Sequence, residues 1–202
     1  METEQRSGHV QLEVLTGSAL ADALPRLASL RMEVFREWPY LYDGDAAYEE
    51  RYLADYADAE GGVIVAARAA GVIVGAATGA PMTQQSYEWS EPLSAQGHDL
   101  EGIFYCGESV LLREFRGRGI GHAFFDLRED HARSLGLDRS CFCAVIRPSE
   151  HPARPADYRS LDPFWRGRGY RPLEGVEAEL AWKDIGESDE TTKRLRYWMK
   201  KL

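Results

Sequence analysis

Hydrophobic and polar residues follow one another in patterns that predict short elements in the first part of the chain. Residues 10–15 alternate enough to form a strand, and residues 19–37 carry leucine, valine and phenylalanine at helical spacing. Pro39 ends this helix. A loop of aromatic and acidic residues then leads to a second, short helix over residues 46–56. The pattern therefore predicts one strand followed by two helices.

Two blocks of β-branched and small apolar residues come next. They cover residues 63–67 and 72–78, and the short turn between them ends in glycine, so they predict an antiparallel hairpin. Residues 81–100 mix serine, glutamine, glycine and proline with aromatics, which predicts a long loop with room for a turn of helix. Residues 102–112 are expected to form one long strand.

Helices and strands alternate in the second half of the chain. A helix is expected over residues 120–135, a strand over 139–146 and a short broken helix over 157–168. Two strands, over residues 177–184 and 194–200, follow and are joined by an acidic turn. The apolar face of the first of these helices is expected to carry Ile120, Ala123, Phe124 and Leu127.

The size and apolar content of the chain predict a single domain. Its 202 residues are 44% hydrophobic, which is enough to bury one substantial core. Residues 10–202 are therefore expected to form an α/β (α+β) domain in which helices flank a mixed sheet. Residues 1–9 are polar, and we expect a flexible tail without a secretory signal. No transmembrane span is predicted, because Arg68 interrupts the longest apolar run.

Charge and cysteine content narrow the classes of function. The net charge of −9 argues against general affinity for nucleic acid or an anionic membrane, and it favours small cationic substrates. An odd number of cysteines in a chain of this length indicates a reducing compartment, so a cytoplasmic location is expected. Cys141 and Cys143 share one face of a strand, and the five histidines lack the spacing of metal ligands. No metal ion is therefore predicted.

A glycine-rich turn between a predicted strand and a predicted helix has the composition of an anion-binding site. Its residues are Arg116, Gly117, Arg118, Gly119, Ile120, Gly121 and His122. Alternate glycines let backbone N–H groups approach a ligand, and the helix start adds the positive end of its dipole. A Walker-type phosphate loop is excluded, because no lysine follows the glycines before Lys183. A dinucleotide fingerprint fits poorly, since His122 stands where a third glycine is needed.

The spacing Arg116-x-x-Gly119-x-Gly121 resembles the acyl-CoA-binding loop of the GNAT N-acyltransferase superfamily, whose signature is Arg or Gln-x-x-Gly-x-Gly or Ala. The order of the predicted elements is similar to that family's mixed sheet of six or seven strands. Residues 164–170 resemble its aromatic-x-x-x-Gly-aromatic segment. The resemblance implies a GNAT-like fold. It also implies transfer of an acetyl group from acetyl-CoA to a primary amine, by direct attack in a ternary complex.

The same resemblance implies how coenzyme A is held. The strand before the loop would splay from its neighbour, and the backbone of Leu111, Leu112 and Arg113 would bond the pantetheine arm and polarise the thioester carbonyl. The N–H groups of residues 117–122 would hold the pyrophosphate, with charge from the two arginines of the loop. Trp165 would pack against the pantetheine or the core.

Glu108 is the candidate base that would accept a proton from the attacking amine. It lies three residues before the backbone that would bind pantetheine, and alternation places it on one face with Cys106 and Val110. Burial there would make its carboxylate a stronger base. A solvated glutamate at a strand kink explains the residue equally well. His98 or Glu101, acting through water, are weaker alternatives.

The general acid for the departing thiolate is missing from its usual place. In the family a tyrosine often lies five residues before the closing aromatic, and counting back from Tyr170 gives Trp165. Tyr158, earlier in the predicted broken helix, is the first choice instead. A thiolate can also leave without an acid. Acylation of Cys143 is a minor alternative to direct transfer.

The acceptor is expected to be a small-molecule or peptide amine. By the same resemblance, acidic and aromatic residues between the first two helices could line its pocket. These residues are Glu37, Trp38, Tyr40, Tyr42, Asp43 and Asp45. A capped and solvated loop explains them equally well.

Other functions and a homodimer stay open at this point. A GNAT-like module that binds coenzyme A as a sensor, without transfer, is compatible with the missing tyrosine. Arg-Gly segments at residues 116–119 and 166–169 could bind RNA, but the acidic total opposes this. The last two strands, which carry Trp182, Tyr197 and Trp198, could provide a contact between subunits.

Overall fold

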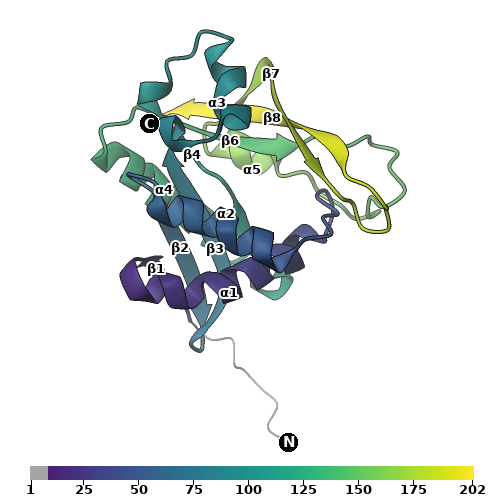
Figure 1. Cartoon of the computed structure of the whole chain (residues 1–202), viewed down its shortest axis with the longest axis horizontal. Helices are drawn as coiled ribbons and strands as arrows, with labels where there is room; N and C mark the ends of the chain where they lie inside the picture. Colours follow the sequence, from purple (N-terminus) through teal and green to yellow (C-terminus); the bar gives the residue numbers. More distant parts are fainter. Residues whose placement is uncertain (1–8) are drawn as a thin grey trace, which may run out of the picture.

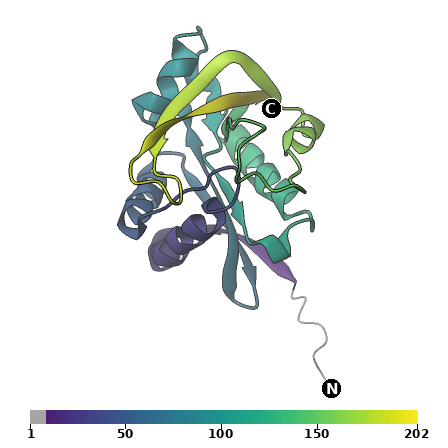
Figure 2. The same cartoon turned by 90° about the vertical axis from the view of Figure 1, so that its right-hand side faces the viewer.

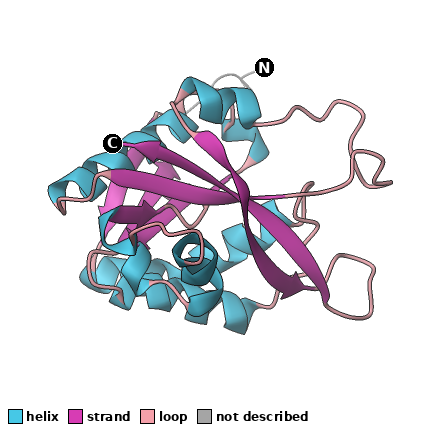
Figure 3. Ribbon diagram, turned by 90° about the horizontal axis from the view of Figure 1, so that it is seen from above, coloured by secondary structure: helices cyan, strands magenta, loops and turns pink. Residues whose placement is uncertain are grey.

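The computed structural model of the chain describes residues 9–202, which form one eight-stranded sheet with helices around it (Figures 1 and 3). The strands are β1 (Val10–Leu15), β2 (Val63–Ala69), β3 (Val72–Pro81), β4 (Ile103–Tyr105), β5 (Ser109–Leu111), β6 (Arg139–Val145), β7 (Arg171–Trp182) and β8 (Thr191–Lys201). The helices are α1 (Gly17–Phe35), α2 (Ala46–Asp58), α3 (Tyr87–Ser94), α4 (Ile120–Ser134) and α5 (Asp162–Gly167). Three short 3-10 turns are η1 (Met82–Gln84), η2 (Leu100–Gly102) and η3 (Arg113–Phe115). Of the predicted tail over residues 1–9, residues 1–8 lie outside the described residues.

The strands lie in the order β1-β2-β3-β4-β6-β8-β7, and β5 also pairs with β3. The pair β4–β6 is parallel, whereas the other pairs are antiparallel. The sheet is therefore mixed, and the predicted fold class is confirmed.

Helices cover both faces of the β2–β3 part of the sheet, with α1 and α2 on one side and α4 on the other (Figure 2). Ile64 and Ala66 of β2 join the core under α1 and α2. Val63 and Val65, which point the other way, join the core that contains Phe124 of α4. This burial on both faces explains why β2 reads as a continuous apolar run rather than an alternating one.

The long strand predicted over residues 102–112 is wrong as a single element, because it is split into β4 and β5. The break falls at Gly107, where a Cβ atom would collide with the hydroxyl groups of Tyr56 and Thr78. It also breaks the expected alternation: Cys106 joins the core on the α4 side, and Val110 joins the core under α1 and α2. Placing Cys106 on one face with Glu108 and Val110 was therefore wrong. The split also raises the number of strands above the expected six or seven.

Three smaller differences concern helices. The predicted loop over residues 81–100 contains α3, an eight-residue helix in spite of Pro92. Leu127 is 36% exposed, because the buried face of α4 is formed by Phe124, Phe125 and Arg128 instead. The helix predicted over residues 157–168 begins only at Asp162.

The aromatic residues of the last strands belong largely to the core. Tyr197 and Trp198 are buried within the chain, so they do not offer a contact to another subunit. Trp182 lies next to Tyr40, with ring centroids 6.1 Å apart. Among the helices formed by residues 9–202, none combines the length and the apolar character that a membrane span requires.

Candidate active site

A cleft opens where two neighbouring strands of the sheet part. β4 and β6 run side by side up to the pair Tyr105 and Cys141, and the N–H of Cys106 donates to the Cys141 carbonyl at 2.8 Å. Beyond this point β5 pairs only with β3, while β6 continues along β8. The separated strands border a cleft of about 850 Å³.

Several parts of the chain line this cleft together. The glycine-rich loop contributes Arg116, Gly117, Gly119, Gly121 and His122. The separated strands and α5 contribute Glu108, Ser109, Leu111, Phe142, Cys143 and Trp165. The loop after α1 and the connection before α5 contribute Glu37, Trp38, Pro39, Tyr40 and Tyr158. Of the other residues expected to bind coenzyme A, Arg113 also lines the cleft, whereas Leu112, Arg118 and Ile120 are not part of its lining.

The glycine-rich loop presents a run of free backbone donors. Gly117 and Gly119 have φ angles of 75° and 82°, a region that favours glycine, and a Cβ atom at either position would meet open space. Gly119 is the N-cap of α4. Within residues 9–202, no backbone or side-chain acceptor contacts the N–H groups from Gly117 to His122. Six successive free donors at a helix start are an arrangement that can bind an anion.

Two arginines near the loop are held by a glutamate from the loop after α1. Arg116 donates from Nε to the Leu111 carbonyl at 2.9 Å and from Nη1 to Glu37 at 2.8 Å. Arg113 donates to the same carboxylate at 3.1 Å. Arg118 instead donates to the Glu114 carbonyl at 2.8 Å. Glu37 therefore ties the loop after α1 to the glycine-rich loop, a link that the sequence did not predict.

The backbone of β5 also has donors that face the cleft. The N–H of Thr78 donates to the Glu108 carbonyl at 3.1 Å, and the N–H of Leu112 donates to the Val74 carbonyl at 3.0 Å. In an antiparallel ladder, alternate residues bond to opposite sides. The N–H groups of Ser109 and Leu111 therefore point away from β3, toward the side that β6 has left.

Glu108 lies beside the cleft and is buried, with 9% of the residue exposed. Its carboxylate pairs with Arg31 of α1 at 2.6 Å and accepts a hydrogen bond from Tyr52 of α2 at 3.0 Å. Arg31 also pairs with the buried Glu49. Although burial opposes its charge, these neighbours hold the pKa of Arg31 well above its usual value. Glu108 is thus a partnered carboxylate rather than a solvated one.

Tyr158 lies in the connection before α5 and packs its ring edge-on against Trp38, with centroids 6.0 Å apart. Partial burial, together with Asp162, raises the pKa of Tyr158, so the phenol keeps its proton at neutral pH. Trp165, where the resemblance led us to expect a tyrosine, packs against Phe142 and Trp198 with centroids 5.0 and 5.2 Å away. Both Tyr158 and Trp165 line the cleft.

Sequence reasoning missed Arg147, which clamps the loop after α1 onto the last hairpin. Its guanidinium binds both carboxylate oxygens of Asp184, at 2.6 and 2.9 Å. It also donates to the carbonyls of Pro39 and Tyr40 at 2.9 and 2.6 Å. Arg147 and Lys193 keep the pKa of Asp184 below its usual value in spite of burial. The only feature of the sequence that pointed to Arg147 was its place directly after a predicted strand.

Cys143 and Cys141 face the same core, as alternation along one strand predicted. Burial raises the pKa of the Cys143 thiol well above its usual value, so a reactive thiolate is disfavoured at this position. Within the described residues, no group of three or more histidine, cysteine or acidic side chains is placed to hold a metal ion.

A comparison of sequence and fold with known proteins gives the family. The family model described as Acetyltransferase (GNAT) family matches residues 26–156, which is more than half of the chain. The chain belongs to the GNAT acetyltransferase family. No protein of known, curated function matches it in sequence.

Solved GNAT structures share the fold of this chain at low sequence identity. A ribosomal-protein-alanine N-acetyltransferase from Brucella melitensis is 15% identical, with a TM-score of 0.61 over 95% of this chain and 99% of that one. The Salmonella typhimurium protein yncA, solved with its cofactor acetyl-CoA, is 12% identical, with a TM-score of 0.58 over 95% and 94% of the two chains. An aminoglycoside 6'-N-acetyltransferase complexed with coenzyme A is 14% identical, with a TM-score of 0.57 over 95% and 96%. These similarities concern the fold alone.

Proposed function

We propose that the chain is an N-acetyltransferase that moves an acetyl group from acetyl-CoA to a primary amine by direct attack in a ternary complex. The observation that carries this proposal is the continuity of one cleft from the free N–H groups of the glycine-rich loop to the aromatic loop after α1. One part of the cleft suits a phosphorylated donor, and the other leaves room for an acceptor. Membership of an acetyltransferase family supports the same reaction.

The donor is held, in this proposal, by backbone groups. The N–H groups of residues 117–122 bind the pyrophosphate of coenzyme A, and the N–H of Ser109 or Leu111 bonds the thioester carbonyl oxygen. A backbone donor fixed in a strand stabilises the negative charge that develops on this oxygen without first having to reorient. Trp165 packs along the pantetheine arm.

Glu108 is proposed as the base and Tyr158 as the acid. As the amine nitrogen forms its bond to the carbonyl carbon, Glu108 takes the nitrogen's proton, directly or through water. The bond from carbon to sulfur then breaks, and the thiolate takes a proton from Tyr158. An amide and a free thiol result. Glu108 then releases its proton to solvent and Tyr158 takes one up, so the protons balance over one turnover.

Glu108→Gln is expected to lower kcat about 100-fold, because an amide of the same shape cannot take the proton. The measurement is the release of free coenzyme A thiol at saturating substrate. Glu101→Gln is the matched control, since Glu101 was the alternative candidate and is exposed on η2. A loss at Glu101 with none at Glu108 would contradict the assignment. Because Glu108→Gln also removes a buried partner of Arg31, each variant is assayed below its own unfolding temperature.

Tyr158→Phe is expected to lower kcat about 10-fold, because protonation of the thiolate then falls to water. The raised pKa of Tyr158 keeps its proton available at neutral pH. Tyr87→Phe, on the exposed surface of α3, is the control. If thiol release is unchanged in Tyr158→Phe, the thiolate leaves without this residue.

The acceptor class is tested by measuring acetyl-CoA turnover with a panel of amines that contains polyamines, amino acids, aminoglycosides and peptide N-termini. The neighbours named above act on a ribosomal-protein alanine and on an aminoglycoside, which places both classes in the panel. Trp165, at the position of the usual tyrosine, favours a second candidate function, a coenzyme A sensor without transfer. Binding of coenzyme A without acetylation of any amine in the panel would support that alternative.

A further inference from the structure

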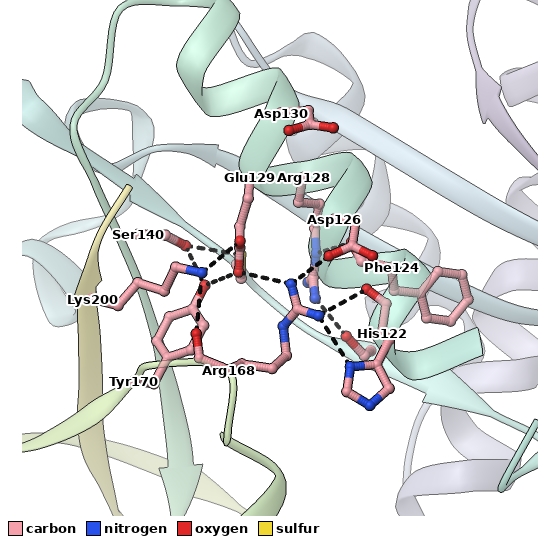
Figure 4. A network of polar contacts seen from close by, with 12 residues as sticks. His122, Phe124, Asp126, Arg128, Glu129, Asp130, Ser140, Arg168, Tyr170 and Lys200 are labelled. Atoms are coloured by element: carbon pink, nitrogen blue, oxygen red, sulfur yellow. Dashed lines mark hydrogen bonds and ion pairs between the residues drawn. The ribbon is translucent and has the colours of Figure 1, made fainter. Parts of the chain in front are cut away.

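The second Arg-Gly segment of the chain reaches the glycine-rich loop through Arg168. Its side chain is 9% exposed and lies against one face of α4 (Figure 4). Nη1 contacts the ring Nδ1 and the carbonyl oxygen of His122, at 3.2 and 3.3 Å. Nη2 donates to Asp126 at 2.6 Å and to Glu129 at 3.2 Å. His122, Asp126 and Glu129 follow one another at intervals of four and three residues, so they lie on one face of α4. One guanidinium therefore contacts this face from the last residue of the loop through the first turns of the helix.

The contact to His122 favours one tautomer of its ring. A guanidinium can only donate, so Nδ1 of His122 must accept and therefore has no proton. The hydrogen of the neutral ring then sits on Nε2. Figure 4 shows this second nitrogen turned away from Arg168, and His122 is part of the cleft lining. An N–H donor is thus available beside the free backbone donors of the loop.

The carboxylate that anchors Arg168 is itself held from several sides. Glu129 is buried and binds Lys200 of β8 at 2.7 Å and the Tyr170 hydroxyl at 3.0 Å. The same hydroxyl contacts the Ser140 hydroxyl of β6 at 2.8 Å. Such a closed network leaves Arg168 little freedom to leave His122. Arg166, two residues earlier, is exposed instead and lies over the ring of Trp198.

We propose that Arg168 is a positioning residue for the donor. It holds His122 as the Nε2–H tautomer, whose N–H donates to a phosphate oxygen of coenzyme A, and it fixes the start of α4 under the loop. This inference rests on the proposed function, because it concerns the same donor site. It goes beyond that function by giving the His122 side chain a role of its own.

The first test measures the affinity of coenzyme A by calorimetry in Arg168→Gln and His122→Phe. Each is expected to weaken binding about 10-fold, the size of one hydrogen bond to a charged group. His122→Gln, which keeps a side-chain donor, is expected to recover most of the loss. Arg166→Gln is the matched control and should bind as the wild type does. Equal losses in Arg168→Gln and Arg166→Gln would overturn the proposal.

A double variant separates action through His122 from a general structural role. If Arg168 acts through His122, the double variant Arg168→Gln/His122→Phe loses less coenzyme A affinity than the product of the fold-losses of the two single variants. A full product would overturn the coupling. Unfolding temperatures of all variants accompany the measurement, so that a loss of fold is recognised.

Nitrogen NMR of the free protein gives a readout that does not depend on coenzyme A. The wild-type His122 ring is expected to show an unprotonated Nδ1 and a protonated Nε2, and Arg168→Gln is expected to mix the two tautomers. The opposite tautomer in the wild type would overturn the inference even if coenzyme A binds. If the wild type shows the expected tautomer but binds no coenzyme A, the proposed function fails, and with it the role of the His122 side chain.

Discussion

Gly119→Glu is expected to weaken the binding of coenzyme A about a thousandfold, the largest loss of affinity that we expect from any single change. Gly119 is the N-cap of α4, with a φ of 82°, and it lines the cleft with open space around its missing Cβ. A carboxylate there would lie beside the bound pyrophosphate. Like charges about 4 Å apart at an effective dielectric constant of about 20 repel by about 4 kcal/mol, which corresponds to about three powers of ten in affinity.

Gly136→Glu is a matched control for this variant. Gly136 follows the other end of α4, has a φ of 78° and would also place a Cβ atom in open space, but it does not line the cleft. The two variants therefore carry similar backbone strain and the same added charge. Calorimetry with coenzyme A should separate them, with wild-type affinity for Gly136→Glu. Equal affinities in the two variants would contradict an anion site at residues 117–122.

The glycine-rich loop could be located from the sequence because its geometry is set by the backbone. Glycines at fixed spacing before a helix determine where N–H groups point, whatever surrounds them. The pattern at Gly117, Gly119 and Gly121 therefore placed the loop at the start of α4, and the structure has it there. The side chains that contact the loop could not be predicted from local sequence in this way. Arg118 turned to a neighbouring carbonyl, and Arg116 to Glu37, which is 79 residues away.

One residue in the sequence, Gly107, marks the break between β4 and β5. Gly107 stands inside an otherwise strand-like run, and an isolated glycine there is typical of a bulge or of close backbone approach. The approach comes from Tyr56 of α2, which is 51 residues earlier in the chain. Such a contact depends on how α2 packs, so local pattern could not give it. Because this break interrupts the strand, Cys106 and Glu108 lie on different faces, whereas the alternation expected for one continuous strand put them on the same face.

The partners of Glu108 depend on tertiary packing in a similar way. Arg31 lies four residues after Leu27 and four before Phe35, so it occupies the apolar stripe of α1. A long cationic side chain on such a stripe usually extends to solvent. Here it stays buried, because two carboxylates from α2 and the β4–β5 break surround it. A charge within an apolar stripe was the available signal, and the sequence pattern gave no indication of its partners.

Arg31→Met is expected to destabilise the fold by about 3–5 kcal/mol, the usual cost of removing one partner from a buried ion pair. Methionine fills a similar volume but leaves Glu49, which is 0% exposed, and Glu108 without their cation. Arg26→Met on the same helix is the matched control. Arg26 is partly exposed and mainly donates to the Ile73 carbonyl, so its loss is expected to cost about 1 kcal/mol. Urea denaturation measures both values from midpoint and slope.

Adding Glu49→Gln to Arg31→Met tests the physical reason for this loss. If the cost comes from an unpaired buried carboxylate, neutralising that carboxylate should restore part of the free energy of unfolding, although Glu49→Gln alone should lower it. Two independent losses that simply add would instead mean that Arg31 stabilises α1 by packing against Phe35 and Tyr52. In that case the ion pair between Arg31 and Glu49 would contribute little to the free energy of unfolding.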